Sequence, residues 1–172
     1  AVKSSMRDIW RRSVYTASLA HVMARHCGFD PDRALLAGLI QDIGALPLLA
    51  NLKDFPSLTS EPSAIKELLN EFTGKISGLI LHNWHFDEEL ILVGLNRENW
   101  MRDKNPTADL ADLILIARYH TYLDERSHGK LPQLSRLPAF KKLHLQEMGP
   151  EQGLAFLSEA KQEISELRSA LL

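Results

Sequence analysis

A polar pair at the end of an apolar segment is the part of this sequence best suited to chemistry. Gln41 and Asp42 directly follow the apolar stretch 34–40, and Gly44 comes two residues later. A carboxylate in such surroundings is costly to bury without a partner, so packing alone does not account for Asp42. The pattern therefore predicts a cationic group beside Asp42 in the folded chain.

The motif around this pair resembles a known signature. Residues 38–44 read Gly-Leu-Ile-Gln-Asp-Ile-Gly. This segment resembles the Gly-Leu-Leu-His-Asp-Ile-Gly signature of the HD superfamily of metal-dependent phosphohydrolases, with glutamine in place of the histidine. The substitution falls inside the strongest motif of the chain.

Three further features narrow the resemblance to the HDOD branch, a regulatory relative of the HD and HD-GYP phosphodiesterases in bacterial signalling proteins. They are the Trp10-x-x-Ser13-x-x-x-Ala17 pattern, Trp84, and the segment 115–117. The resemblance covers roughly residues 9–122 and does not extend over 127–172. HDOD modules usually carry another helical stretch before the Trp-x-x-Ser helix, so the resemblance implies a fragment or a truncated relative.

The resemblance also implies where a metal site would lie. In active HD proteins, an early histidine, a His-Asp pair and a late aspartate hold one or two divalent metals, which activate water for phosphoester hydrolysis. These positions fall at Arg12, Gln41, Asp42 and Arg118. Arginine has no lone pair to donate and brings positive charge, and an amide is a weaker ligand than imidazole. Proteins of the HD-GYP type carry further histidines, which would fall near 96–98 and are absent here. We therefore expect no catalysis and no cofactor, and we interpret Asp42 as a residue retained from a lost metal site.

Two interpretations of these four residues stay open, besides a one-residue shift in the alignment at Arg12 and Arg118. In the first, one of these arginines pairs with Asp42 and replaces the metal by a guanidinium. In the second, the arginines bind the phosphate or carboxylate of a small signalling ligand. An Arg–Asp contact that closes the pocket would argue against the ligand.

Other reactive side chains give weaker signals. His82 and His85 form a His-x-x-His pair, but no Cys or carboxylate lies in register to complete a metal site. Cys27 lies at the C-terminal end of a predicted helix, where the dipole raises a thiol pKa, so it is interpreted as a packing residue. The chain has no Gly-rich phosphate loop and no zinc-ligand spacing.

Composition limits the function classes. The 172 residues carry 20 Lys+Arg and 22 Asp+Glu, a formal charge of −2, which argues against a nucleic-acid-binding domain. No apolar run reaches the roughly 18 residues of a membrane span, and the N-terminus has no signal-peptide pattern. The single cysteine fits a reducing compartment, so we expect a cytoplasmic protein.

Helical periodicity and a scarcity of strand-forming residues predict an all-α fold, a compact HD-domain-like bundle with a C-terminal helical extension. We expect a core over 1–126, a linker over 127–138, and an extension over 139–172 that packs on the core. Within the core, the second helix is predicted to be the buried central element. The predicted helices are 5–27, 31–43, 62–72, 75–84, 88–97, 105–125, 139–145 and 150–171.

These observations together predict a non-enzymatic bacterial signal-transduction module of HDOD type that acts through protein–protein contacts. The alternatives are a divergent HD-type phosphohydrolase acting on a nucleotide or cyclic dinucleotide, and a nucleotide-sensing pocket without turnover. The expected partners are proteins of a signalling pathway, with a small phosphorylated ligand as an option. The sequence does not predict an oligomeric state.

Overall fold

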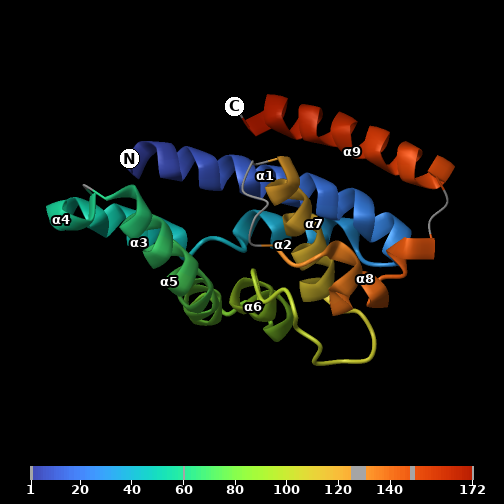
Figure 1. Cartoon of the computed structure of the whole chain (residues 1–172), viewed down its shortest axis with the longest axis horizontal. Coiled ribbons are helices and arrows are strands. Elements are labelled where there is room, and N and C mark those ends of the chain that lie inside the picture. Colours follow the sequence, from blue (N-terminus) through green and yellow to red (C-terminus); the bar gives the residue numbers. More distant parts are fainter. Residues whose placement is uncertain (1, 60, 125–130, 148–149, 172) are drawn as a thin grey trace.

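The computed structural model of the chain describes residues 2–59, 61–124, 131–147 and 150–171. Over these ranges the chain is helical and contains no strand (Figure 1), as the composition predicts. The helices are α1 (Val2–Cys27), α2 (Pro31–Ile40), α3 (Ala45–Asn51), α4 (Pro56–Thr59), α5 (Pro62–Asn83), α6 (Glu88–Leu95), α7 (Leu110–Asp124), α8 (Pro138–Lys142) and α9 (Pro150–Leu171), with short 3₁₀ turns at Leu52–Asp54, Leu134–Arg136 and Leu145–Glu147.

The core is built around α7. Every residue from 110 to 119 is buried, and α7 packs against α1, α2, α6 and α8. The prediction that the second helix is the central element is therefore wrong. Leu36 of α2 is 39% exposed, because this helix lies at the edge of the bundle. In α7, by contrast, the segment 113–117 is wholly apolar and buried.

The turn between α2 and α3, which contains Asp42, packs against α5 through Gly44. The second helix ends at Ile40 rather than near 43, and residues 41–44 form a turn. The Gly44 amide donates to the Ser77 hydroxyl of α5 at 2.9 Å, and a side chain at Gly44 would overlap the α5 backbone at Thr73 and Ser77. The glycine thus permits a close approach of two backbones.

A single helix, α5, replaces the two helices expected over 62–72 and 75–84. Gly74, which follows the first of the two predicted ranges, lies inside the continuous helix. A Cβ atom at this position would lie 3.2 Å from the Gly94 carbonyl oxygen of α6. The small residue therefore serves the contact between α5 and α6. The helix expected from 105 also starts later, at Leu110.

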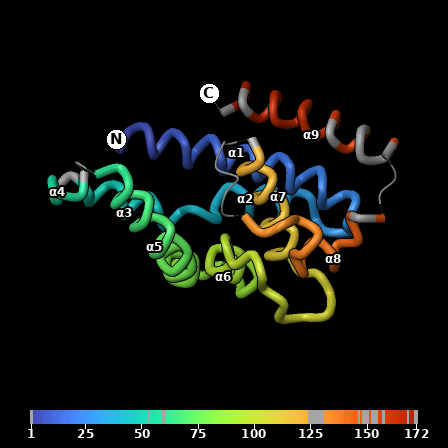
Figure 2. Tube along the Cα trace, viewed as in Figure 1, coloured from blue at the N-terminus to red at the C-terminus, as the bar shows by residue number. Residues whose placement is uncertain are grey.

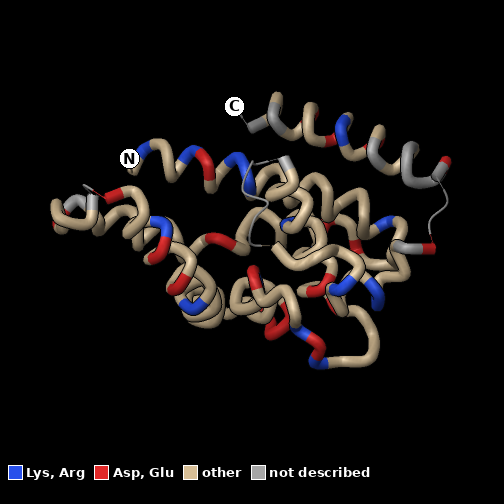
Figure 3. Tube along the Cα trace, in the orientation of Figure 1, with Lys and Arg blue, Asp and Glu red and all other residues tan. Residues whose placement is uncertain are grey.

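The C-terminal helix α9 lies along α1 (Figure 2), joined to it by ion pairs. Arg25 pairs with Glu159 and, at 2.5 Å, with Glu163, and His21 Nδ1 lies 2.7 Å from the Glu163 carboxylate. Charged residues of both signs are interspersed along the chain (Figure 3). This pattern agrees with the near-zero formal charge.

The segment expected to be a linker, 127–138, is described from 131 onward, and 127–130 lie outside the described residues. Leu137 is fully buried, and Leu131 and Leu134 pack against the main core cluster. The Tyr119 hydroxyl donates to the Pro132 carbonyl at 2.8 Å. The described part of this segment is thus held on the core.

One stretch of the described chain, Pro31–Asn51, is long and apolar enough to pass a length-and-hydropathy test for a membrane span, with a mean hydropathy of 1.4. It consists of two helices with a turn between them, and the turn contains the buried, ion-paired Asp42. A core helix passes the same test, so the match is weak evidence for a span.

Candidate functional site

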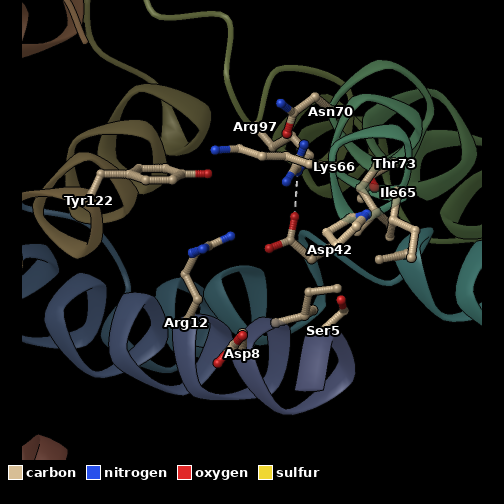
Figure 4. A pocket seen from close by; sticks show the side chains of 14 residues that line it. Ser5, Asp8, Arg12, Asp42, Ile65, Lys66, Asn70, Thr73, Arg97 and Tyr122 are labelled. Atoms are coloured by element: carbon tan, nitrogen blue, oxygen red, sulfur yellow. Dashed lines mark hydrogen bonds and ion pairs between the residues drawn. The ribbon is translucent and has the colours of Figure 1, made fainter. Parts of the chain in front are cut away.

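Two arginine side chains form ion pairs with the carboxylate of Asp42. Arg118 donates through Nη1 to Oδ2 at 2.6 Å. The Nε of Arg97 donates to Oδ1, the contact drawn as a dashed line in Figure 4. All three side chains are buried. Burial alone would raise the pKa of Asp42, but Arg118 and Arg97 outweigh it and lower the pKa to about 2. Asp42 is therefore ionised at neutral pH and is paired on both oxygens.

Glu98 is the fourth charged residue of this network, and its side chain is more exposed than those of Asp42, Arg97 and Arg118. It accepts a hydrogen bond from Arg118 Nη2 at 2.8 Å and one from the Tyr122 hydroxyl at 2.5 Å, and it lies 3.1 Å from Arg97 Nη2. Burial raises the pKa of Glu98, but Arg118 and Arg97 more than offset this, so its pKa is lowered. The pKa of Arg118 is raised well above its usual value by Asp42, Tyr122 and Glu98, against the opposing effect of burial. Two carboxylates and two guanidinium groups thus balance each other's charge.

These side chains come from three parts of the fold. Asp42 lies in the turn after α2, and Arg97 and Glu98 follow the end of α6. Arg118 and Tyr122 are one helical turn apart on α7, and Arg118 Nη2 donates to the Tyr122 hydroxyl at 3.1 Å. The network therefore joins α2, α6 and α7 at one point inside the bundle.

Of the four residues that the sequence predicts for the site, the structure pairs two and gives the other two different contacts. Arg118 and Asp42 come together as an ion pair, which is one of the two interpretations that the sequence left open. Arg12 lies in the same region with its guanidinium carbon 4.8 Å from the centre of the Tyr122 ring. Gln41 is buried and donates from Nε2 to the Gly38 carbonyl at 3.1 Å, within its own helical turn.

Sequence reasoning missed Arg97 and Glu98. The resemblance implies histidines of the HD-GYP type near these positions, and the sequence has none there. The signal that could have indicated them is an arginine beside a glutamate at a place where the resemblance implies metal ligands. No apolar periodicity marks the segment 96–99, so nothing in the sequence predicts that Arg97 is buried.

The residues at this site do not fit a divalent metal ion. Both oxygens of Asp42 are held by guanidinium groups, which repel a cation and donate no lone pair. The described part of the chain contains no group of three His, Cys, Asp or Glu side chains that could hold a metal. His82 and His85 are exposed, and burial raises the pKa of the Cys27 thiol, so none of the three suggests another reactive centre.

A pocket of about 250 Å³ remains in front of Asp42, between α1, α5 and α7 (Figure 4). The Arg118–Asp42 contact therefore does not close the site. Residues of both polar and apolar character line it: Ser5, Asp8, Ile9, Arg12, Asp42, Ala45, Pro62, Ile65, Lys66, Leu69, Asn70, Thr73, Arg97 and Tyr122.

Comparison with solved structures supports the fold. The crystal structure of a "putative metal-dependent phosphohydrolase" from Shewanella amazonensis SB2B superimposes with a TM-score of 0.81 at 24% sequence identity. The match covers 96% of the present chain and 61% of the Shewanella chain. At this identity the similarity establishes a shared fold, that of HD-like proteins. Among curated protein sequences, none matches the chain.

Comparison with protein families identifies the domain. The model of the HDOD domain matches residues 2–99, which is more than half of the chain. The match includes α1, the Gln41-Asp42 turn and Arg97. The chain therefore belongs to the HDOD domain family.

Proposed function

We propose that this chain is a non-enzymatic regulatory module of a bacterial cytoplasmic signalling pathway and acts through contacts with other proteins. The observation that carries the proposal is the pairing of both Asp42 oxygens with Arg97 and Arg118. Asp42 is the only residue retained of the HD metal signature. Its carboxylate is therefore engaged in holding three parts of the bundle together.

The charge balance of the network supports the loss of hydrolysis. A divalent metal at Asp42 would have to displace two buried guanidinium groups and leave them with Glu98 as their remaining carboxylate. Removing one partner from a buried ion pair costs about 3–5 kcal/mol. The same network suits a scaffold, because it fixes α2, α6 and α7 relative to one another while the outer faces of the helices stay available for partners.

Purification followed by metal analysis and a hydrolysis assay tests the proposal. The protein is produced in medium supplied with Mn, Fe and Ni, and it is assayed with nucleotides and cyclic dinucleotides. The proposal expects neither a stoichiometric metal nor turnover above the level of an Asp42→Ala variant. Stoichiometric metal together with turnover that Asp42→Ala abolishes would instead support the divergent phosphohydrolase.

A further inference from the structure

We infer that the N-terminal half of α1 is a docking surface for an amphipathic helix of a partner protein, and that the polar side of this helix is acidic. The surface deepens the proposed function, on which it rests, because it names the chemistry of the partner. A basic stripe, an apolar stripe beside it, and the docking of α9 on the other half of the same helix support it.

The first turns of α1 carry an exposed basic stripe. Lys3, Arg7 and Arg11 are exposed and follow one another at intervals of four residues, so they lie on one side of the helix. Figure 3 shows these positive charges repeated along this half of α1. Asp8 is the one acidic residue between 2 and 12, and it pairs with Arg11 at 3.3 Å. Lys3 and Arg7 have no carboxylate partner among the described residues, so their charges are available to a partner.

An apolar stripe runs beside the basic one. Met6 and Trp10 are 38% and 43% exposed, and they too are four residues apart on α1. Each lies three residues after a member of the basic stripe, so the two stripes are neighbours on the helix surface. Tryptophan and arginine are the residue types that contribute most to protein–protein binding, and methionine adapts to apolar partners. The two stripes together match a helix that presents aliphatic residues beside carboxylates.

The second half of α1 already holds a helix of this chemistry. The helix α9 contains four glutamates and two basic residues. It runs antiparallel to α1, because Glu159 pairs with Arg25 and the Glu163 carboxylate lies 2.7 Å from His21, one turn further along α9 and one turn earlier on α1. Phe156 and Ala160 of α9 supply the apolar contact with the core. An acidic amphipathic helix therefore fits this side of α1.

The cations that hold α9 recur in the first half of α1. His21 and Arg25 form the pairs with α9. Eighteen residues earlier, the chain has Lys3 and Arg7 at the corresponding positions. Because 18 residues make about five turns of an α-helix, both pairs lie on the same side of α1. The basic stripe thus continues the surface on which α9 docks.

The helix α9 does not reach this continuation. At an equal rise per residue, its last residue, Leu171, lies level with about residue 13 of α1. Figure 1 shows α1 extending past this end of α9 to the N-terminus. The opposite side of the same segment is packed, since Val2 and Ile9 contact the small core cluster of Leu49, Leu52 and Ile65. The free stripes are therefore held on a fixed helix.

A protein helix fits these stripes better than a lipid surface does. Helices that lie in a membrane interface bury a broad apolar face opposite their charges. In the first half of α1, Ile9 and Val2 are turned to the core, and the exposed apolar stripe consists of Met6 and Trp10 alone. The apolar stripe lies beside the cations, as in a surface that receives an amphipathic helix.

Fluorescence anisotropy with a labelled peptide tests this surface. The probe is a designed peptide of about 18 residues, with leucines at helical spacing and a neighbouring stripe of glutamates. A control peptide carries glutamine at each glutamate position. The protein variants are Arg7→Glu and Trp10→Ala, and the matched control is Arg136→Glu, the same charge reversal at an exposed arginine outside α1. Circular dichroism checks that each variant is folded.

We expect the acidic peptide to bind the wild type and Arg136→Glu with equal affinity, and the glutamine peptide to bind at least about tenfold more weakly. Arg7→Glu should lower the affinity for the acidic peptide about tenfold or more, because it removes a cation and adds a like charge. Trp10→Ala should lower it about tenfold, since a tryptophan anchor is lost. The proposal is overturned if the wild type does not bind the acidic peptide, if Arg7→Glu and Arg136→Glu bind it equally, or if Trp10→Ala binds it as the wild type does.

Other occupants of the surface are distinguished with the same variants. Vesicles of phosphatidylglycerol and phosphatidylcholine, a duplex DNA, and self-association of the protein are measured in parallel. Binding to vesicles or DNA, or dimerisation, that Arg7→Glu abolishes would overturn the proposal if the acidic peptide does not bind. All measurements contain EDTA and no nucleotide. A failure here therefore leaves the result of the metal and turnover assay unchanged, and turnover in that assay would not alter the peptide affinities.

Discussion

Arg118 and Asp42, which are 76 residues apart in the sequence, meet at 2.6 Å in the interior of the bundle. Both are buried, and each has a second charged partner, Glu98 for the arginine and Arg97 for the aspartate. The four groups form a closed network of two carboxylates and two guanidinium groups. Under the proposed function, this network takes the place that the resemblance implies for the metal of an HD phosphohydrolase.

Asp42→Ala should destabilise the protein strongly, because it leaves Arg97 and Arg118 buried without their shared carboxylate. Removing one partner of a buried pair costs about 3–5 kcal/mol. Urea denaturation of the two proteins measures the difference in free energy of unfolding. Asp8→Ala, at a half-exposed carboxylate in an exposed pair, is the control and should change it by less than about 1 kcal/mol. A cost at Asp42 as small as that at Asp8 would argue against the network.

Arg118→Lys should also be destabilising, although the charge is kept. The guanidinium reaches Asp42 with one nitrogen and Glu98 with another, and a single ammonium group cannot reproduce this fork. We expect a loss of about 2 kcal/mol, since one charge-assisted hydrogen bond is worth about 1.5–3 kcal/mol. The exposed Arg136→Lys serves as the control and should be neutral. Equal stability of the two variants would mean that Arg118 does not bridge the carboxylates.

The pH dependence of stability should carry the signature of Asp42. Its pKa is about 2 in the folded protein against an ordinary 3.8, so its contribution is fully present above pH about 4 and is lost as the pH falls toward 2. The difference corresponds to about 2 kcal/mol. The pKa of Glu98 is also lowered, so it adds to the loss in the same direction.

Unfolding of the wild type and of Asp42→Asn, followed from pH 7 to pH 2.5, tests this contribution. The carboxylates outside the network are common to both proteins, so their contributions cancel to first order. Glu98 shares Arg97 and Arg118 with Asp42, so its contribution stays part of the measured difference. The stability difference between the two proteins should shrink as the pH falls below about 4. A difference that stays constant over the whole range would contradict the low pKa of Asp42.

Much of the fold follows from local signals in the sequence. Asp30 caps α2 by accepting hydrogen bonds from the amides of Asp32 and Arg33, as the Asp-Pro pair predicts. The predicted C-terminal helix over 150–171 corresponds to α9. Gly74 shows where such signals fail. A glycine can end a helix, or it can lie inside a helix and permit a close contact with a neighbour. Here α6 lies close to Gly74, so the second role applies, and the local sequence does not show this.

The site was predictable to a smaller extent. The motif at 38–44 marks Asp42 as the retained residue and suggests an arginine as its partner. Arg97, however, pairs with Asp42 across 55 residues, and no periodicity in its own segment indicates burial. Such a contact depends on how α6 approaches the turn after α2, which is a property of the packed bundle.

The ion pairs between α1 and α9 should hold the C-terminal helix in place. Arg25 contacts both Glu159 and Glu163, so Arg25→Ala removes two pairs at once. Because Arg25 is partly exposed, the free energy of unfolding of the whole protein should fall by less than about 1 kcal/mol.

The effect on α9 itself should be clearer and is measured by hydrogen exchange. The amides of α9 should exchange faster in Arg25→Ala, whereas exchange in α7 should be unchanged. Arg11→Ala, in an exposed pair within α1, should leave α9 unchanged. An unaltered α9 in Arg25→Ala would mean that the two Arg25 pairs do not hold this helix.

Guanidinium groups at Asp42 in place of a metal leave no divalent-cation site there, and a manganese titration measures this. Calorimetry with Mn²⁺ is carried out on the wild type and on Asp42→Asn at neutral pH, where Asp42 is ionised. We expect the wild type to show no saturable binding that Asp42→Asn removes. One-to-one binding of Mn²⁺ to the wild type, lost in Asp42→Asn, would show instead that Asp42 is a metal ligand.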